Sequence, residues 1–416
     1  MCAGEQTFPL PSSATDATST QIWIEQPSIN RGEVISSEGL EHIAGHKYKG
    51  GQYTTLDLAL DDTWKALTKL LPLWLAPNMV TTIGGLLMLV SYFLIWAISP
   101  NWDEECPSWS IFVCGLCIIA YYTLDCMDGK QARRTGASSP LGQLFDHGVD
   151  CLSTMLQIST VGAFTQSGGS ARILAIQTST QFLFYICQWE EYYTGVLQHA
   201  NGNLGVTEVN YGMGLATIVN ALVSRNYWHM KMEEFFPIAI VGLIPSKFAS
   251  FTVLQIGTVL WVSLMIMCAF VPLLRVYRHV ESTSVFLKAL SKLTTPILLL
   301  TSTFIIPSHI ISEHTRFLSI SVGLLLCLLS IKTIVHSMAK MPFAVFQIEA
   351  IPYCALCLYL RCSPDVSSDS AKLLLSFSAF LATFSLSSWA RAAILQISQR
   401  LDIYCFSIKK SSTKKE

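Results

Sequence analysis

Charged residues are scarce in this chain. Of its 416 residues, 13% are Asp, Glu, Lys or Arg, which is about half the share found in an ordinary soluble domain, whereas 51% are hydrophobic. The formal net charge of −1 argues against a nucleic-acid partner, for which a strongly basic face is expected. We therefore expect no nucleic-acid partner and predict an all-α, polytopic integral membrane protein.

Paired cysteine motifs and a leading apolar segment are also lacking. The 13 cysteines, many of them inside apolar runs, do not form the framework of a secreted disulfide-rich domain. Cys354 and Cys357 have no second pair at a suitable distance for a metal site, so we interpret them as small residues of a membrane helix. Residues 1–35 are polar and hold no signal-peptide core, and we expect residues 1–45 to form a disordered cytosolic tail.

Long hydrophobic runs fill most of the remaining chain. Each run needs roughly 20 apolar residues to cross a bilayer core. On this basis we predict about ten transmembrane helices, near residues 78–99, 108–124, 147–166, 171–188, 206–222, 249–275, 287–306, 315–334, 343–361 and 372–397. Ahead of them, residues 46–76 mix charges with Leu and Trp at helical spacing. This pattern favours an N-terminal amphipathic helix lying in the membrane interface over a soluble helix packed on a domain core.

The distribution of basic residues predicts the orientation in the membrane. The loop of residues 99–108 holds no Lys or Arg, whereas the next loop region holds Lys130, Arg133 and Arg134. Because short cytoplasmic loops carry the excess of Lys and Arg, we expect the second loop and both termini to face the cytosol. Residues 399–416 would then be a basic cytosolic tail.

Four carboxylates stand close together in the sequence where the second predicted span ends and the third begins. Asp125 and Asp128 are three residues apart, and Asp146 and Asp150 are four apart, so each pair projects from one face of a helix. Each unpaired aspartate costs about 2.5 to 3.5 kcal/mol inside a bilayer. Two facing pairs would make a cage for Mg²⁺ or Mn²⁺, and we expect two such ions, which can clamp a diphosphate.

Glycines and cations accompany these carboxylates. Gly129 and Gly142 allow close approach of the backbone to a ligand, and Lys130, Arg133 and Arg134 can bind phosphate oxygens. A purely structural set of salt bridges between two helices is the alternative. Four carboxylates against three cations leave a net negative site, which favours a metal.

The whole segment resembles the signature of the CDP-alcohol phosphotransferase family. Its pattern is Asp-x2-Asp-Gly-x2-Ala-Arg-x8-Gly-x3-Asp-x3-Asp, and every fixed position is filled here from Asp125 to Asp150. Further segments, at residues 77–81, 144–148 and 206–209, look like the eukaryotic choline and ethanolamine phosphotransferases. Residues 189–197 resemble the ethanolamine branch more than the choline branch. The resemblance covers most of residues 40–220.

The resemblance implies the last step of phosphatidylethanolamine or phosphatidylcholine synthesis. Diacylglycerol would attack the β-phosphorus of CDP-ethanolamine or CDP-choline, and CMP would leave. Carried over by position, the metal ligands would be Asp125, Asp128, Asp146 and Asp150, and the residues against the CDP moiety would be Asn78, Asp128, Gly129, Lys130, Arg133 and Gly142. Residues 77–275 would form the catalytic unit with spans one to six. Residues 276–398, with spans seven to ten, would add packing or dimer surface.

Two residues compete for the role of general base. The family suggests Asp150, but a metal-bound carboxylate is a poor base. His147, whose unperturbed pKa is near 6.5, suits cytosolic pH better, and it is our choice over a structural histidine bonded to a ligand carboxylate. Gln143 stands where relatives often have Glu, and this departure leaves the base assignment open.

Candidate head-group residues lie further along the chain. Trp189 and Tyr192, and Tyr193 beside them, could attract an ammonium group through their rings, and Glu208 could contact it through its carboxylate. Aromatic side chains are equally typical of membrane interfaces, and Glu208 of a solvated acid. The family also implies a homodimer in the endoplasmic reticulum or Golgi membrane. Choline-specific and dual-specificity enzymes, an enzyme joining CDP-diacylglycerol to inositol, and a transporter with a carboxylate ion pathway are the alternatives.

Overall fold

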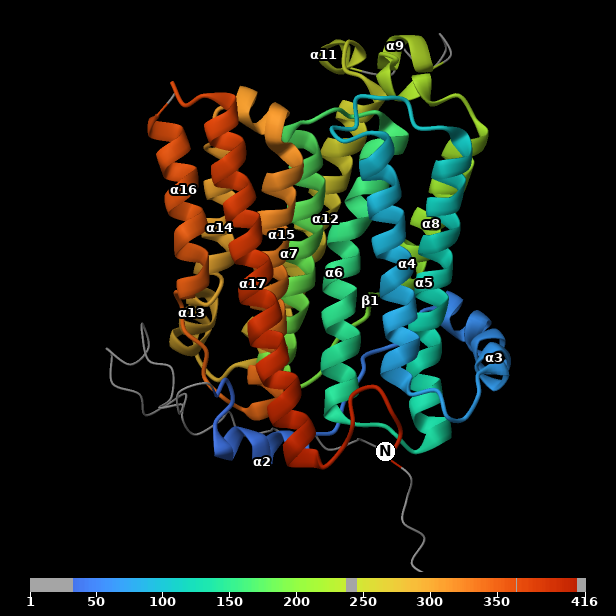
Figure 1. Cartoon of the computed structure of the whole chain (residues 1–416), viewed down its shortest axis with the longest axis vertical. Coiled ribbons are helices and arrows are strands. Elements are labelled where there is room, and N and C mark those ends of the chain that lie inside the picture. The colour runs from blue at the N-terminus through green and yellow to red at the C-terminus, as the bar shows by residue number, and fades with distance from the viewer. Residues whose placement is uncertain (1–32, 237–244, 364, 410–416) are drawn as a thin grey trace, which may run out of the picture.

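The computed structural model of the protein describes residues 33–236, 245–363 and 365–409. The described part is mostly helical, and the prediction of a helical protein is confirmed. Its two strands, β1 (Ala200–Asn201) and β2 (Leu204–Gly205), form one short antiparallel hairpin. Most of the long helices run parallel to the long axis of the molecule (Figure 1).

In chain order the long helices fall into two groups. The first comprises α4 (Pro77–Ile98), α5 (Ser108–Thr135), α6 (Pro140–Thr165), α7 (Ala171–Thr194) and α8 (Val206–Leu222). The second comprises α12 (Val253–His279), α13 (Thr283–Ser291), α14 (Thr294–Phe304), α15 (Ser308–Ala339), α16 (Ile351–Cys362) and α17 (Ser368–Leu401). Shorter elements are α2 (Ser37–Gly45), α3 (Thr55–Leu70), η2 (Arg225–His229), α9 (Met232–Phe235), α11 (Ser246–Ala249) and η3 (Ile348–Ala350).

Five helices within the described ranges are long and apolar enough to cross a membrane: α4, α5, α12, α15 and α17. A bent pair, α13 with α14, raises the number to six if it counts as one span. The predicted number of about ten is therefore not confirmed. Helices α8, α14 and α16 have 17, 11 and 12 residues and are short for a span, and α7 buries Gln177, Gln181 and Gln188 inside the bundle, which lowers its hydropathy.

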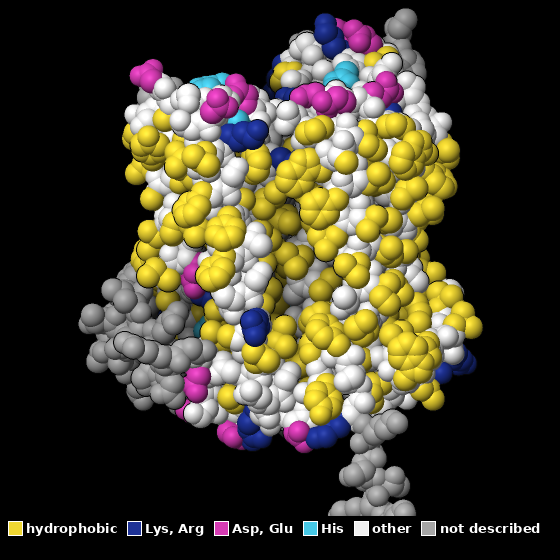
Figure 2. Space-filling view, in the orientation of Figure 1, with side chains coloured by type: hydrophobic (Ala, Val, Ile, Leu, Met, Phe, Trp, Pro, Cys, Tyr) yellow, Lys and Arg dark blue, Asp and Glu magenta, His cyan; other side chains and the backbone are white. Residues whose placement is uncertain are grey.

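On the face shown in Figure 2, a broad hydrophobic band crosses the middle of the molecule, and charged side chains gather at its two ends. This distribution matches a multi-pass membrane protein, whose lipid-facing surface is apolar and whose ends meet water. Helix α15 is the exception among the candidate spans, because almost all of its apolar segment is buried inside the protein. It packs against α6, α7 and α17 and therefore joins the two groups of helices.

A tight turn between α5 and α6 brings the acidic segment together. Gly136 ends α5 in the left-handed conformation, with φ of 67°. The Ser139 hydroxyl then accepts a hydrogen bond from the Gly142 amide at 3.2 Å and caps α6, with Pro140 in its first turn. Because the turn is short, the end of α5 and the start of α6 lie side by side, near the lower end of the bundle in Figure 1.

Two predicted terminal segments are corrected in part. Residues 1–32 of the expected disordered tail lie outside the described residues, but Ser37–Gly45 form α2, capped by Ser36, with Ile43 buried beneath α15 and α17. At the other terminus α17 continues to Leu401, three residues into the predicted tail, and residues 402–409 return to the bundle. In both places an apolar or polar contact with the bundle compensates for the loss of chain entropy.

Helix α3 forms within the segment predicted to be an interfacial helix. Thr54 and Asp57 make a reciprocal capping box at its start, with bonds of 2.8 and 3.1 Å. Trp64 faces α5, while Leu58 and Leu70 are exposed. The helix lies at the outside of the bundle, beside the lower part of α5 (Figure 1). Its membrane-interface position stays a prediction.

Candidate metal centre

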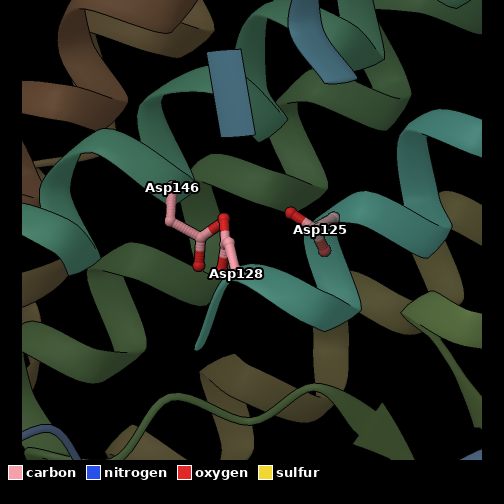
Figure 3. Close-up of side chains that lie close together, drawn as sticks. All are labelled: Asp125, Asp128 and Asp146. Atoms are coloured by element: carbon pink, nitrogen blue, oxygen red, sulfur yellow. The ribbon is translucent and has the colours of Figure 1, made fainter. Parts of the chain in front are cut away.

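Three of the four motif aspartates converge on one space. Asp125 and Asp128 come from α5 and Asp146 from α6, and each offers a carboxylate oxygen within 4.8 Å of the other two. Figure 3 shows the three carboxyl groups directed toward one another. Like charges this close repel each other strongly in a site away from water, so the group favours a bound cation.

Hydrogen bonding leaves part of this acidic group without partners. The Thr81 hydroxyl of α4 donates to Asp128, which is 5% exposed. By contrast, Oδ1 of Asp125 and Oδ1 of Asp146 are buried without a hydrogen-bond partner among the described residues. A buried, unpaired carboxylate oxygen is costly, whereas Mg²⁺ and Mn²⁺ prefer such hard oxygen ligands. The donor set therefore fits a divalent ion.

Asp150 lies beside this group. Its side chain is adjacent to Asp125, and the Tyr121 hydroxyl of α5 donates a hydrogen bond to it. The carboxylate oxygens that lie within 4.8 Å of one another belong to Asp125, Asp128 and Asp146. The role of Asp150 as a fourth ligand stays a prediction.

His147 is buried next to the aspartates on α6. Its Nδ1 has no hydrogen-bond partner in the described part of the chain, and its ring meets the Tyr48 ring edge-on at 5.8 Å between centroids. The Tyr48 hydroxyl in turn pairs with Nε2 of His199 at 2.5 Å. A neutral imidazole leaves one ring nitrogen as a proton acceptor, so an unpartnered nitrogen here suits the predicted base.

The predicted CDP-binding residues divide into two sets. Asn78 at the start of α4 lies beside Gly142, since a Cβ on that glycine would meet Asn78 Oδ1 at 3.7 Å. The Arg133 guanidinium lies near Gly129 and within electrostatic range of Asp128. These residues are near the aspartates, as a common nucleotide site requires.

Lys130 instead faces α3. Its ammonium binds Asp61 Oδ1 at 2.8 Å and lies 5.2 Å from the centre of the Trp64 ring. Hydrogen bonds from Lys130 and Lys65 lower the pKa of the Asp61 carboxyl to about 2. This pairing favours an anchoring role for Lys130, between the end of α5 and α3.

The predicted head-group residues are occupied by other contacts. The Trp189 indole is buried and donates to the carbonyl of Ala289 at 3.0 Å, and the Tyr192 hydroxyl donates to the carbonyl of Met341 at 3.1 Å. Glu208 accepts from the Gly205 amide at 2.9 Å and caps α8. The structure therefore gives each of these side chains a packing or capping contact, and their head-group role stays a prediction.

Several residues at the site were not singled out as site residues from the sequence. Thr81 and Tyr121 bind aspartates, and Tyr48 reaches His147 from a segment ahead of α3. The Gln143 side chain hydrogen-bonds to Nε2 of His46 at 2.9 Å and donates to Oε1 of Glu191 at 3.2 Å. The buried carboxyl group of Glu191, on α7, therefore lies close to the start of α6. Tyr121 lies four residues before Asp125, on the same face of α5, which is a signal that helical spacing could have supplied.

The fold and the site define a multi-pass helical membrane protein with a buried acidic centre for a divalent cation. Residues 74–228 match the sequence model of the CDP-alcohol phosphatidyltransferase family, and this chain carries a domain of that family. The predicted resemblance to this family is confirmed, and the matched segment contains the complete acidic motif.

Relatives of the chain include choline and ethanolamine phosphotransferases. Choline/ethanolaminephosphotransferase 2 of Arabidopsis thaliana is 35% identical over 210 residues, which cover 49% of this chain and 52% of that protein. Cholinephosphotransferase 1 of Homo sapiens is 31% identical over 218 residues, covering 52% of each chain. The similarity thus spans about half the length of both.

Similarity to one relative continues through the C-terminal helices. CDP-alcohol phosphatidyltransferase class-I family protein 3 of Dictyostelium discoideum is 29% identical over 401 residues, 91% of this chain and 99% of that protein. The resemblance described from the sequence covers most of residues 40–220, and this match extends further.

Proposed function

We propose that this protein transfers a phosphoethanolamine or phosphocholine group from the corresponding CDP-alcohol to diacylglycerol. The products are CMP and phosphatidylethanolamine or phosphatidylcholine. One observation carries the proposal: the acidic motif of the matched family forms a converging group in which two buried carboxylate oxygens have no hydrogen-bond partner among the described residues. Such a group suits a metal-assisted reaction at a pyrophosphate.

Asp125, Asp128 and Asp146 would hold the divalent ion, with Asp150 beside them. When bound, Mg²⁺ or Mn²⁺ would neutralise pyrophosphate charge and make the phosphorus more open to attack. Thr81 and Tyr121 fix two of the carboxylates through hydroxyl donors, so the acidic side chains are oriented before substrate arrives. Asn78, Arg133 and the glycines would bind the nucleotide.

His147 would take the proton of the diacylglycerol hydroxyl. As the oxygen forms its bond to the β-phosphorus, the bond between that phosphorus and the CMP oxygen breaks, and CMP leaves. The unpartnered Nδ1 of His147 supports this choice, whereas Asp150 already accepts a hydrogen bond from Tyr121. The arrangement needs diacylglycerol to reach the site from the bilayer.

We place the acidic centre at the cytosolic end of the bundle. The helix ends and loops at that end carry Arg133, Arg134, Arg278, Lys340 and Arg400, whereas the opposite loop between α4 and α5 carries Asp103, Glu104 and Glu105. An excess of basic residues favours the cytosolic side. We further propose a homodimer in the endoplasmic reticulum or Golgi membrane.

The test is a transfer assay on purified protein in lipid nanodiscs. With Mg²⁺ or Mn²⁺ and diacylglycerol, we expect CMP to be released from CDP-ethanolamine or CDP-choline in step with new phospholipid, and chelation by EDTA to stop both. Parallel reactions with the two CDP-alcohols measure the head-group preference. CMP release without phospholipid, or no turnover of either donor, would refute the proposal.

A further inference from the structure

The C-terminal half contains a polar pocket far from the acidic motif in sequence. It has a volume of about 90 Å³ and is lined by Lys332, His336, Phe343, Gln347, Glu349 and Trp389, together with Glu33 at its rim. Figure 2 shows acidic, basic and histidine side chains interrupting the hydrophobic band on the side of the molecule formed by α13, α14 and α16. A polar pocket at such a position calls for a ligand with polar groups.

The polar groups of this pocket offer acceptors for a cation. Lys332 is 3% exposed and binds Gln347 Oε1 at 3.1 Å and Glu349 Oε1 at 2.5 Å. The second oxygen of Glu349 is buried without a hydrogen-bond partner among the described residues. His336 Nδ1 donates to the Lys332 carbonyl at 2.5 Å, which leaves Nε2 as an acceptor in the neutral ring.

The net charge and the aromatic rings of the pocket also favour a cationic ligand. Among the side chains that line the pocket, two carboxylates, Glu33 and Glu349, face one ammonium, Lys332, which leaves one negative charge in surplus. Trp389 and Phe343 add rings that attract cations. The Lys292 ammonium lies 5.3 Å from the centre of the Phe343 ring and donates a hydrogen bond to the Phe343 carbonyl. Lys292 does not itself line the pocket.

An apolar groove adjoins the pocket at Gln347, which lines both. The groove lies between α14 and α16, has a volume of about 340 Å³, and is bounded mainly by apolar side chains such as Leu298, Ile305 and Leu358. Thr295 at its beginning donates to the Val345 carbonyl at 2.7 Å and accepts from the Gln347 amide at 3.1 Å, so the groove begins where the polar loop ends. From Thr295 to Ile305 a helix rises roughly 15 Å, which is the scale of an acyl chain.

We propose that the pocket and the groove together bind one phospholipid whose head group carries an ammonium. The ammonium contacts Glu349 and the rings of Phe343 and Trp389, and one acyl chain lies in the groove between α14 and α16. A polar pocket joined to an apolar groove of this length matches one amphiphile, whereas a free amino alcohol would leave the groove unfilled. The site is separate from the acidic centre, so the proposal does not depend on the transfer reaction.

The experiment is photo-crosslinking of the full-length protein in nanodiscs with phosphatidylethanolamine that carries a photoactivatable acyl chain. We expect labelled peptides from residues 295–305 and 351–358. Unlabelled phosphatidylethanolamine should compete, while phosphatidylglycerol, which lacks an ammonium, and free ethanolamine, which lacks a chain, should compete at least about tenfold more weakly. Equal competition by phosphatidylglycerol or by free ethanolamine would overturn the assignment.

Two variants test the two halves of the site. Glu349→Gln removes the negative charge at constant size and should weaken labelling about tenfold, with Glu313→Gln, on the first turns of α15, as its matched control. Ala355→Phe fills the groove and should abolish labelling there, with Ser387→Phe at an exposed position of α17 as control. The groove variant leaves the Lys332–Glu349 pair intact, so it decides the question even if Glu349→Gln fails to fold.

Three results would contradict the proposal. Labelling that Ala355→Phe leaves unchanged would exclude the groove. Labelling that the folded Glu349→Gln variant retains in full would exclude the ammonium site. A shift from dimer to monomer in Ala355→Phe, measured by mass photometry, would assign the groove to an interface between two copies instead.

Discussion

The spacing of Asp125, Asp128, Asp146 and Asp150 was sufficient to predict an acidic group on two adjacent helices. The helical repeat puts residues three or four apart on one face of a helix. The turn at Gly136 reverses the direction of the chain, so that α6 follows beside α5. The convergence of three of the four is confirmed. Their individual partners, Thr81 and Tyr121, depend on how α4 packs against α5 and α5 against α6, which the local sequence does not specify.

The unpartnered oxygens at this centre lead to a prediction for Asp146→Asn. Without metal, removal of one carboxylate relieves repulsion, so we expect the variant in EDTA to unfold at or above the temperature of the wild type. Wild-type protein at a Mn²⁺ concentration 100 times its Kd should gain about 2.7 kcal/mol of stability, and the variant should lose most of this gain. Thermal unfolding with and without Mn²⁺ measures both. An equal gain in the variant would exclude Asp146 as a ligand.

His147→Ala separates proton transfer from binding. General bases contribute about 100-fold to 10,000-fold to rates, so we expect a loss of kcat in that range with CDP-alcohol affinity nearly unchanged. Turnover and equilibrium binding of the CDP-alcohol measure the two effects. Tyr121→Phe is the comparison, because it removes the donor to Asp150 but not the imidazole. Wild-type kcat in His147→Ala would transfer the base role to Asp150.

The packing of some helix pairs depends on close contact between their backbones, which the sequence of either helix indicates only in part. Helices α5 and α8 cross where Gly115 meets Gly214, and a Cβ on Gly115 would lie 3.0 Å from the Gly214 carbonyl and 2.6 Å from Ile218 Cγ1. Small residues permit this approach in membrane bundles. The crossing holds α8 against the helix that carries Asp125 and Asp128.

We therefore expect Gly115→Ala to destabilise the protein by about 1 to 3 kcal/mol, since the new methyl group meets backbone that cannot move freely. Gly212→Ala on α8 is the control, because no atom of the described residues lies within 4 Å of its added Cβ. That change should be neutral or stabilising by up to about 1 kcal/mol from helix propensity. Denaturant unfolding in detergent compares the variants, and equal stability of the two would show that the crossing is loosely packed.

At the scale of the whole molecule, the ends of the bundle differ in charge, and this difference predicts its orientation. Cys362 ends α16 at the end of the bundle opposite the acidic centre and is exposed, whereas Cys405 follows α17 at the acidic end. In sealed microsomes, we expect a membrane-impermeant thiol reagent to label Cys405 first and to reach Cys362 after permeabilisation.

Cys362→Ser and Cys405→Ser identify the two signals in that experiment. Cys405 is half-buried, with Asn78 donating to its carbonyl at 3.0 Å, so its labelling should be slower than that of an open thiol. Labelling of Cys362 in intact microsomes, with Cys405 protected, would reverse the orientation and place the acidic centre in the lumen.

The amino-acid sequence by itself determined the helical class, the membrane setting, the family and the acidic motif. These features are local, because hydrophobic runs and helical spacing are set by neighbouring residues. The residues nearest the motif in sequence, from Asp125 to Asp150, were accordingly the best predicted part of the site.

Only the tertiary structure decided which side chains complete the site and which serve elsewhere. Lys130 turned out to bind Asp61, Trp189 and Tyr192 to hold α7 against distant segments, and Cys405 to reach Asn78 across more than 300 residues of chain. The predicted number of about ten spans is not confirmed for a related reason: α8, α14 and α16 are short for a span, and α7 carries glutamines that are buried inside the bundle. Contacts between segments far apart in sequence depend on packing of the whole bundle, and no local pattern encodes them.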